Sequence, residues 1–378
     1  MDNKKIRAIG ALALTALWAV LTLFAWFGPK QDISLSERRP LEQMPQLSGE
    51  DLLDGSFMKD FESYSLDQFP LRDTFRSIKS LVHYYALNQS DNNGIYIADG
   101  IAAQMEYPLN GTSVEHALSR FENVYQRYLK DQATGIYMAV IPDKGYYLAE
   151  ENGYLAMDYA AMFDAFRQGM PWAEQIDLTD TLSAEAYYRT DTHWRQEALA
   201  EAAGKLCAAM NAGAFEEGEL TPVLVERPFY GVYYGQAALP MEPDALYLLE
   251  SELLSGCTTW LGELDPATGQ GIYRKLYDGV YDRERLEGAD MYEAYLSGSQ
   301  SLIRIENPNA NSDRELIIFR DSFGSAIAPL LVKEYAVVTL VDIRYIQQNL
   351  LERFDINWNA DVLFLYSTLV LNNSTTIK

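Results

Sequence analysis

Short runs of β-forming residues alternate with helical patterns along most of the chain. These runs occupy residues 136–141, 175–178, 316–319, 336–341 and 362–366, and most of them are apolar throughout. Continuous apolar runs are typical of strands in a parallel sheet, because helices cover both faces of such a sheet. The pattern therefore predicts an α/β fold, a three-layer sandwich in which helices enclose a mainly parallel sheet.

Residues 212–312 break this alternation between the second run and the third. The segment is rich in glycine, proline and tyrosine, and it contains the aromatic stretch 229–235. We interpret it as an insertion that forms a lid or a substrate platform over the end of the sheet. The main domain is predicted to span residues 61–378 and to include this insertion.

The N-terminus carries an apolar run from Ala8 to Phe27. About 20 helical residues reach about 30 Å, which matches the hydrocarbon thickness of a bilayer. The run lacks a small-x-small cleavage site, which favours an uncleaved transmembrane helix over a signal peptide. Residues 1–30 are therefore predicted to be a cytoplasmic tail and a single-pass membrane anchor, and residues 31–60 a polar tether to an extracytoplasmic domain.

The composition excludes some classes of function. With 48% hydrophobic and 22% charged residues, the chain of 378 residues has a globular composition. Its formal net charge of -24 opposes nucleic-acid binding, because that binding needs fields of Lys and Arg that release counterions. Only Cys207 and Cys257 are present, which is too few for a zinc site or a disulfide framework. They can pair or remain free thiols, and no metal or cofactor is expected.

Histidine is scarce, so histidine-dependent chemistry must use His83, His116 or His193. The first two lie in ordinary helical patterns. His193 follows Asp191 in a loop before a strong helix, where the nearby carboxylate can hold the imidazole Nδ1 and leave Nε2 free as a base. The alternative is that Asp191 only caps the helix and His193 packs in the loop.

The apolar run at 316–319 leads into Arg320, Asp321 and Ser322, and a helical pattern follows at once. This places Ser322 at the carboxyl edge of a parallel sheet, where α/β folds bind their ligands. The N–H groups after it are expected to point into the pocket as oxyanion donors. A structural helix start is the alternative. Together with Asp191 and His193, the serine predicts a Ser-His-Asp site.

Competing motifs are missing from the sequence. It contains no Gly-x-Ser-x-Gly elbow, no His-Glu-x-x-His helix and no phosphate-binding loop. Six ordered motifs instead resemble the DHHW protein family and its relatives, the alginate O-acetyltransferase proteins with an SGNH-hydrolase-like fold. They are SERRPL (36–41), DQFPLR (67–72), PDK (142–144), DTHW (191–194), DSFG (321–324) and VDIRY (341–345). The Asp-His element precedes the serine, so the motif order is permuted relative to other SGNH enzymes.

The resemblance implies that Ser322 is the nucleophile, His193 the base and Asp191 the carboxylate that orients it. Two positions depart from the family pattern. Thr192 replaces the histidine that gives the family its name, as in the acetyltransferase form, and Arg320 stands where many SGNH proteins have glycine. No Gly-x-Asn-Asp block is evident, so the usual asparagine oxyanion donor has no counterpart.

Arg344, Asp321 and Tyr188 are further candidates for oxyanion or substrate contacts, although Arg344 fits a salt bridge with Asp342 equally well. The resemblance implies a serine acyltransferase that O-acetylates an exported or cell-surface polysaccharide. A multi-pass membrane acyltransferase would be the partner that supplies the acyl group. Two alternatives stay open, a carbohydrate esterase with the same triad and a non-catalytic polysaccharide-binding or assembly protein.

Overall fold

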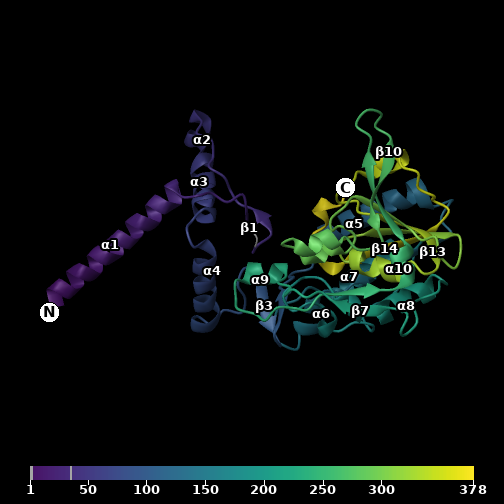
Figure 1. Cartoon of the computed structure of the whole chain (residues 1–378), viewed down its shortest axis with the longest axis horizontal. Helices are drawn as coiled ribbons and strands as arrows, with labels where there is room; N and C mark the ends of the chain where they lie inside the picture. Colours follow the sequence, from purple (N-terminus) through teal and green to yellow (C-terminus); the bar gives the residue numbers. More distant parts are fainter. Residues whose placement is uncertain (1–2, 35) are drawn as a thin grey trace. The chain divides into compact units, whose positions relative to one another are not determined.

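The computed structural model describes residues 3–34 and 36–378. The chain forms two compact units, one of Met1–Asn93 with Tyr234–Pro240 and one of Gly94–Tyr233 with Met241–Lys378 (Figure 1). Residues 61–93 therefore belong to the first unit, whereas the sequence placed them in the main domain.

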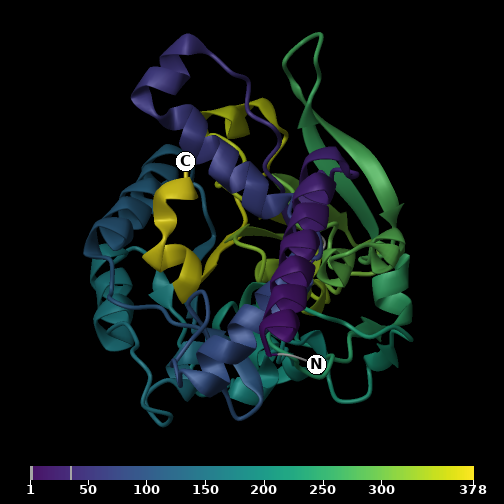
Figure 2. The ribbon, with the colours of Figure 1, turned by 90° about the vertical axis from the view of Figure 1, so that its left-hand side faces the viewer.

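The first unit is built from helices and one short hairpin. Its helix α1 is long and apolar enough to cross a membrane, with a mean hydropathy of 2.1, and it runs as one unbroken helix (Figure 2). The predicted tether is not a plain linker, because it contains the hairpin and two helical segments. The elements are α1 (Asn3–Phe27), β1 (Ile33–Ser34), β2 (Arg39–Pro40), α2 (Gly49–Asp54), α3 (Ser56–Asp67), α4 (Arg72–Leu81) and the π-helical turn η1 (Val82–Ala86).

The second unit alternates strands and helices as predicted. Its strands are β3 (Ile95–Ala98), β4 (Ile101–Gln104), β5 (Gly135–Ile141), β6 (Glu174–Gln175), β7 (Thr221–Leu224), β8 (Tyr247–Glu250), β9 (Thr258–Leu264), β10 (Gly271–Asp278), β11 (Leu302–Glu306), β12 (Arg314–Arg320), β13 (Tyr335–Val341) and β14 (Asp361–Ser367). Its α-helices are α5 (Gly111–Val124), α6 (Lys144–Leu148), α7 (Tyr159–Gly169), α8 (Ala200–Ala209), α10 (Glu252–Gly256), α11 (Gly324–Ile327) and α12 (Thr368–Asn372), and α9 (Val232–Ala237) starts in this unit. Short 3-10 and π turns complete it, namely η2 (Tyr125–Leu129), η3 (Ala184–Ala186), η4 (Gln196–Ala198), η5 (Arg283–Glu287), η6 (Met291–Ala294), η7 (Ala328–Leu331), η8 (Gln348–Arg353) and η9 (Ser374–Thr376).

An eight-stranded sheet lies at the centre of this unit, in the order β10-β9-β11-β13-β12-β14-β5-β6. The strands from β13 to β6 pair in parallel, and β11, β9 and β10 continue the sheet in antiparallel register. Every predicted run contributes to one of the parallel strands. The expected mainly parallel sheet is confirmed.

Helices cover both faces of the sheet because the side chains of its strands alternate between two apolar cores. In β12, Leu316 and Ile318 join one core, and Ile317 and Phe319 join the other. Residues of α8 complete the first core, and residues of α5 and α7 complete the second. The three-layer sandwich is therefore confirmed.

The segment 212–312 does not form a lid separate from the sheet. Its strands β9, β10 and β11 extend the sheet itself. Its turn η6, however, brings Tyr292 against His193. The segment is thus both part of the sheet and part of the cover over the carboxyl ends of the parallel strands.

Candidate active site

Ser322 lies in the turn between β12 and α11, at the carboxyl end of the parallel strands. The carboxylate of Asp321 holds this turn in place. It accepts hydrogen bonds from the N–H of Ser367 at 2.7 Å, from the hydroxyl of Ser367 at 2.6 Å and from the N–H of Phe323 at 3.0 Å. Asp321 is fully buried, whereas Ser322 is partly exposed, so the serine lies on the solvent side of this turn.

The structure brings Asp191, His193 and Ser322 together, although 129 positions separate the histidine from the serine. The Nδ1–H of His193 donates to Oδ1 of Asp191 at 2.6 Å, and the Ser322 hydroxyl donates to Nε2 at 2.7 Å. Both distances lie within hydrogen-bond reach, as a nucleophile and its general base require. Because Asp191 fixes the proton on Nδ1, Nε2 is free to accept the serine proton.

Main-chain groups fix the carboxylate of Asp191. Oδ2 accepts the N–H of Val232 at 2.8 Å, and Oδ1 accepts the N–H of His193 at 3.1 Å. The N–H of Gly231 donates to the Thr190 hydroxyl at 2.8 Å. Gly231 must be a glycine here, because a Cβ at this position would lie 2.2 Å from the Cβ of Asp191.

Aromatic side chains hold the imidazole ring. The ring of Tyr292 stacks on that of His193, with centroids 3.8 Å apart and an interplanar angle of 9°. Phe323 contacts the imidazole at a centroid distance of 4.9 Å. Trp194 in turn donates its Nε1–H to the carbonyl oxygen of Phe323 at 3.0 Å. The imidazole is therefore held in one plane, with its two nitrogens directed at the carboxylate and at the serine.

Lys144 supports the loop that carries Asp191. It follows β5, and its buried ammonium donates to the carbonyl oxygens of Asp191 at 2.7 Å and of Tyr188 at 3.0 Å. It also lies 4.8 Å from the centroid of the Tyr233 ring. Burial lowers the pKa of Lys144 to about 7, and the carboxylate of Asp191 is the strongest influence that opposes this shift.

We expect Lys144→Met to change how stability depends on pH. The pKa of Lys144 is about 7 in the folded protein and about 10.4 in an unfolded chain. Between these values the unfolded chain binds more protons, so this group makes the wild type more stable as pH rises, by about 1.4 kcal/mol per pH unit. Urea unfolding of the detergent-solubilised chain at pH 7 and pH 9 should show the wild type gaining stability over the variant. Exposed Lys130→Met is the matched control, and parallel pH profiles for wild type and Lys144→Met would contradict this account.

The predicted oxyanion donors are not where the sequence placed them. The N–H groups of Phe323, Gly324 and Ser325 all donate to acceptors within the turn, namely Asp321 Oδ1, the Asp321 carbonyl and the Ser322 carbonyl. In the described structure these three N–H groups are therefore committed to holding the turn. The expectation that they point into the pocket is corrected.

Arg344 forms the salt bridge that the sequence left open as its alternative role. Its guanidinium donates to both oxygens of Asp342, at 2.9 Å and 2.7 Å. Asp342 also lies 3.8 Å from the buried guanidinium of Arg320. Arg344 is thus paired at the end of β13 through Nε and Nη2, and as an oxyanion contact it would have to use its remaining N–H groups.

Two further candidates, Asp321 and Tyr188, are buried beneath the site. Asp321 binds the turn and does not face a substrate. Tyr188 is fully buried, with its hydroxyl 3.3 Å from that of Tyr295 and its ring against Phe229. The expectation of a substrate contact for Tyr188 is therefore corrected, because the side chain belongs to the core while its carbonyl oxygen binds Lys144.

The other candidate groups lie away from the triad. His116 contacts Ser374 and Arg120 on the second face of the sheet, and Cys207 and Cys257 are buried free thiols. Among residues 3–34 and 36–378, no cluster of His, Cys, Asp and Glu has the arrangement of a metal site.

Sequence reasoning missed Tyr292, Val232 and Lys144 as site residues. Signals for all three were present. Tyr292 and Val232 lie in the aromatic insertion, and Lys144 lies in the PDK motif. None of these sequence features identifies the residue that contacts the triad, because the contact depends on how loops distant in sequence meet at the edge of the sheet.

No family model matches the sequence, and comparison with curated proteins gives no significant match. Solved structures do match. A DHHW family protein from Eubacterium siraeum superimposes with a TM-score of 0.60 at 21% identity, over 76% of this chain and 95% of that one. Bacillus cereus PatB1 superimposes with a TM-score of 0.57 at 18% identity, over 73% of this chain and 96% of that one. The structure of PatB1 with a sulfonyl adduct gives a TM-score of 0.55, also at 18% identity, over 73% of this chain and 95% of that one. The chain therefore shares the fold of a DHHW family protein and of PatB1, and the resemblance seen in its motifs is confirmed at the level of the fold.

Proposed function

We propose that the chain is a serine acyltransferase, anchored in the membrane by α1, that O-acetylates an exported or cell-surface polysaccharide. The observation that carries the proposal is the continuous chain of hydrogen bonds from Asp191 through His193 to the partly exposed Ser322. A buried carboxylate, a fixed imidazole and a reachable hydroxyl in this order are the parts that acyl transfer needs.

The reaction proceeds in two halves. His193 Nε2 accepts the Ser322 proton while the serine oxygen attacks the acyl carbonyl of the donor. The tetrahedral intermediate collapses, His193 returns the proton to the leaving group, and an acetyl ester remains on Ser322. A sugar hydroxyl then gives its proton to Nε2 and attacks this ester. The second tetrahedral intermediate collapses, and His193 returns the proton to the departing oxygen of Ser322, which yields the acetylated sugar and the free Ser322 hydroxyl. General-base help of this kind contributes about 10²-fold to 10⁴-fold.

The acyl donor would come from a multi-pass membrane acyltransferase, because a domain outside the cytoplasm needs its acetyl groups carried across the bilayer. Support for this arrangement comes from α1, which is long and apolar enough to cross a membrane. It would hold the domain beside such a partner. Tyr230 precedes Gly231 and is 41% exposed, and an exposed aromatic ring beside the site suits a sugar acceptor because aromatic faces pack on the C–H surfaces of pyranose rings.

The decisive experiment separates transfer from hydrolysis. The purified full-length chain in detergent is given p-nitrophenyl acetate, with and without an oligosaccharide acceptor. Transferase activity predicts that the acceptor diverts acetyl groups into an acetylated oligosaccharide, seen by mass spectrometry, and lowers the yield of free acetate. An unchanged acetate yield for every acceptor tested would instead support the esterase, and no turnover at all by folded protein would support the non-catalytic alternative.

A further inference from the structure

Leu71, which precedes α4, helix α4 itself and the turn η1 expose a row of apolar side chains that we call the apolar stripe: Leu71, Phe75, Ile78, Val82 and Tyr85. Steps of three and four residues place them on one side of the helix. Each has an exposed fraction between 44% and 66%. Isolated apolar residues are common on protein surfaces, whereas a contiguous stripe marks a surface that something else covers.

The opposite side of α4 is polar and faces the interior of the first unit. Arg72 and Arg76 form ion pairs with Glu37, the second at 3.1 Å. One turn further, the buried hydroxyl of Ser80 accepts the Asn92 side-chain amide at 2.7 Å. A helix on the surface of a water-soluble protein turns its apolar side inward. In α4 the polar side faces inward and the apolar side faces outward, so contact of the outward side with water is unfavourable.

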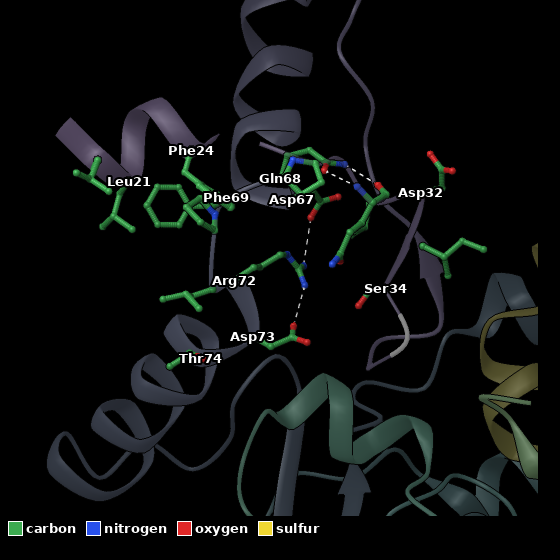
Figure 3. A pocket seen from close by; sticks show the side chains of 17 residues that line it. Leu21, Phe24, Asp32, Ser34, Asp67, Gln68, Phe69, Arg72, Asp73 and Thr74 are labelled. Carbon is green, nitrogen blue, oxygen red and sulfur yellow. Dashed lines mark hydrogen bonds and ion pairs between the residues drawn. The ribbon is translucent and has the colours of Figure 1, made fainter. Parts of the chain in front are cut away.

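The apolar stripe begins at the outer end of α1. A cavity of about 910 Å³ in the first unit is lined by Val20, Leu21 and Phe24 of α1 and by Phe69 and Leu71, the latter the first residue of the stripe. In Figure 3, Leu21, Phe24 and Phe69 lie at the same side of this cavity, with α4 leading away below them. The apolar residues at the outer end of α1 and the first residue of the stripe therefore border the same cavity.

We propose that the apolar stripe rests on the lipid bilayer that α1 crosses, at its outer surface, with α4 lying as an interfacial helix. This rests on the membrane anchoring proposed above. Lipid fits better than a protein occupant, because the stripe begins beside the outer end of a helix that is long and apolar enough to cross a membrane. Arg72 and Arg76 are taken up by Glu37 on the inward side, and the exposed Lys79 is the basic residue of α4 beside the stripe. Amphipathic helices with apolar and aromatic residues on one side lie in the lipid interface in this way.

The test uses the full-length chain reconstituted into vesicles of phosphatidylcholine and phosphatidylglycerol. Single cysteines are introduced by Ile78→Cys on the stripe and by Asp73→Cys on the other side of the helix, and each is labelled with a polarity-sensitive fluorophore. Native Cys207 and Cys257 are at most 1% exposed, so the label goes to the introduced thiol. A probe at position 78 should be quenched by lipids with brominated chains and protected from aqueous iodide. A probe at position 73 should show the reverse.

Further positions separate the possible failures. Tyr85→Cys, on the stripe two turns after position 78, should behave as Ile78→Cys does. Leu14→Cys, in the middle of α1, should be quenched by deep brominated lipids if the anchor spans the bilayer. If brominated lipid quenches the probe at position 14 but not the probe at position 78, α1 spans the bilayer and the stripe does not contact lipid. This result overturns the proposal for the stripe, whether iodide reaches the probe at position 78 or a protein shields it. If lipid quenches neither probe, the membrane anchoring by α1 is overturned as well.

Discussion

Ser322→Ala is expected to lower the turnover of p-nitrophenyl acetate by about 10⁴-fold to 10⁶-fold, because the substitution removes the atom that forms the acyl-enzyme. The fold should survive, since Asp321 and not the Ser322 hydroxyl holds the turn to Ser367. The measurement is kcat on purified full-length protein, with circular dichroism to verify folding.

The site offers a matched control three residues along the chain. The hydroxyl of Ser325 is buried and has no hydrogen-bond partner in the described structure, so Ser325→Ala should leave kcat within a few-fold of the wild type. A triad also acts as a unit, and adding His193→Ala to Ser322→Ala should lower turnover little further. If the loss of turnover in the double variant equalled the product of the losses in the two single variants, the two residues would act independently, which would contradict a shared mechanism.

A covalent probe gives an independent reading of the same prediction. A sulfonyl fluoride reacts with a serine hydroxyl that a base activates, and the 2.7 Å contact between Ser322 and His193 makes it a suitable reagent for this chain. The wild type and Ser325→Ala should each take up one sulfonyl group, located on Ser322 by peptide mass spectrometry. Ser322→Ala should take up none. Labelling of another residue in preference to Ser322 would argue against an activated nucleophile at this position.

Gly231→Ala is expected to lower kcat by about 10²-fold without changing any residue of the triad. The added methyl would lie 2.2 Å from the Cβ, 2.3 Å from the Cα and 2.5 Å from the N of Asp191. Because these are atoms at and beside the main chain, Asp191 cannot rotate away and must shift with its loop. A displacement of about 1 Å at a catalytic group can cost about 10²-fold in rate. The measurement is kcat and KM for p-nitrophenyl acetate, with the loss expected in kcat.

Gly204→Ala supplies the control for the same chemical change. Gly204 lies inside α8, where an added methyl meets no atom within 4 Å. Alanine is favoured over glycine in a helix interior by about 1 kcal/mol, so this variant should be slightly more stable and fully active. Equal activity of Gly231→Ala and wild type would show that the 229–235 stretch does not position Asp191.

The parallel strands of the sheet were predictable because their burial on both faces is visible in the sequence as continuous apolar runs. The runs 316–319 and 362–366 are apolar throughout, and only a strand covered on both faces accommodates such runs. The edge of the sheet was harder to predict. β9 and β10 come from a segment whose glycines and tyrosines indicated irregular structure, and they join the sheet by antiparallel pairing with β11 and with each other. That pairing depends on partners distant in sequence, which local patterns do not reveal.

The candidate triad could be assembled from sequence for a similar reason. Asp191 and His193 are two residues apart, and Ser322 follows a buried strand, so each half carries a local signal. The groups around them do not. Val232 reaches Asp191 through its N–H, which any residue type except proline provides. Arg344 presented the opposite difficulty, because a charged side chain after a strand can face a ligand or a neighbouring carboxylate, and Asp342 was the nearer partner.

The contact between Asp321 and Ser367 links the turn that carries Ser322 to the junction of β14 and α12. The neighbouring Thr368 donates its hydroxyl to Asp143 at 2.6 Å, and Asp143 precedes the lysine that holds the Asp191 loop. Ser322 and the loop of Asp191 and His193 therefore share a brace supplied by Ser367 and Thr368, at the junction of β14 and α12. A chain cleaved between Asp361 and Ser367 would still contain every triad residue but would lack this brace, so proteolysis at β14 is expected to abolish activity without removing a catalytic group.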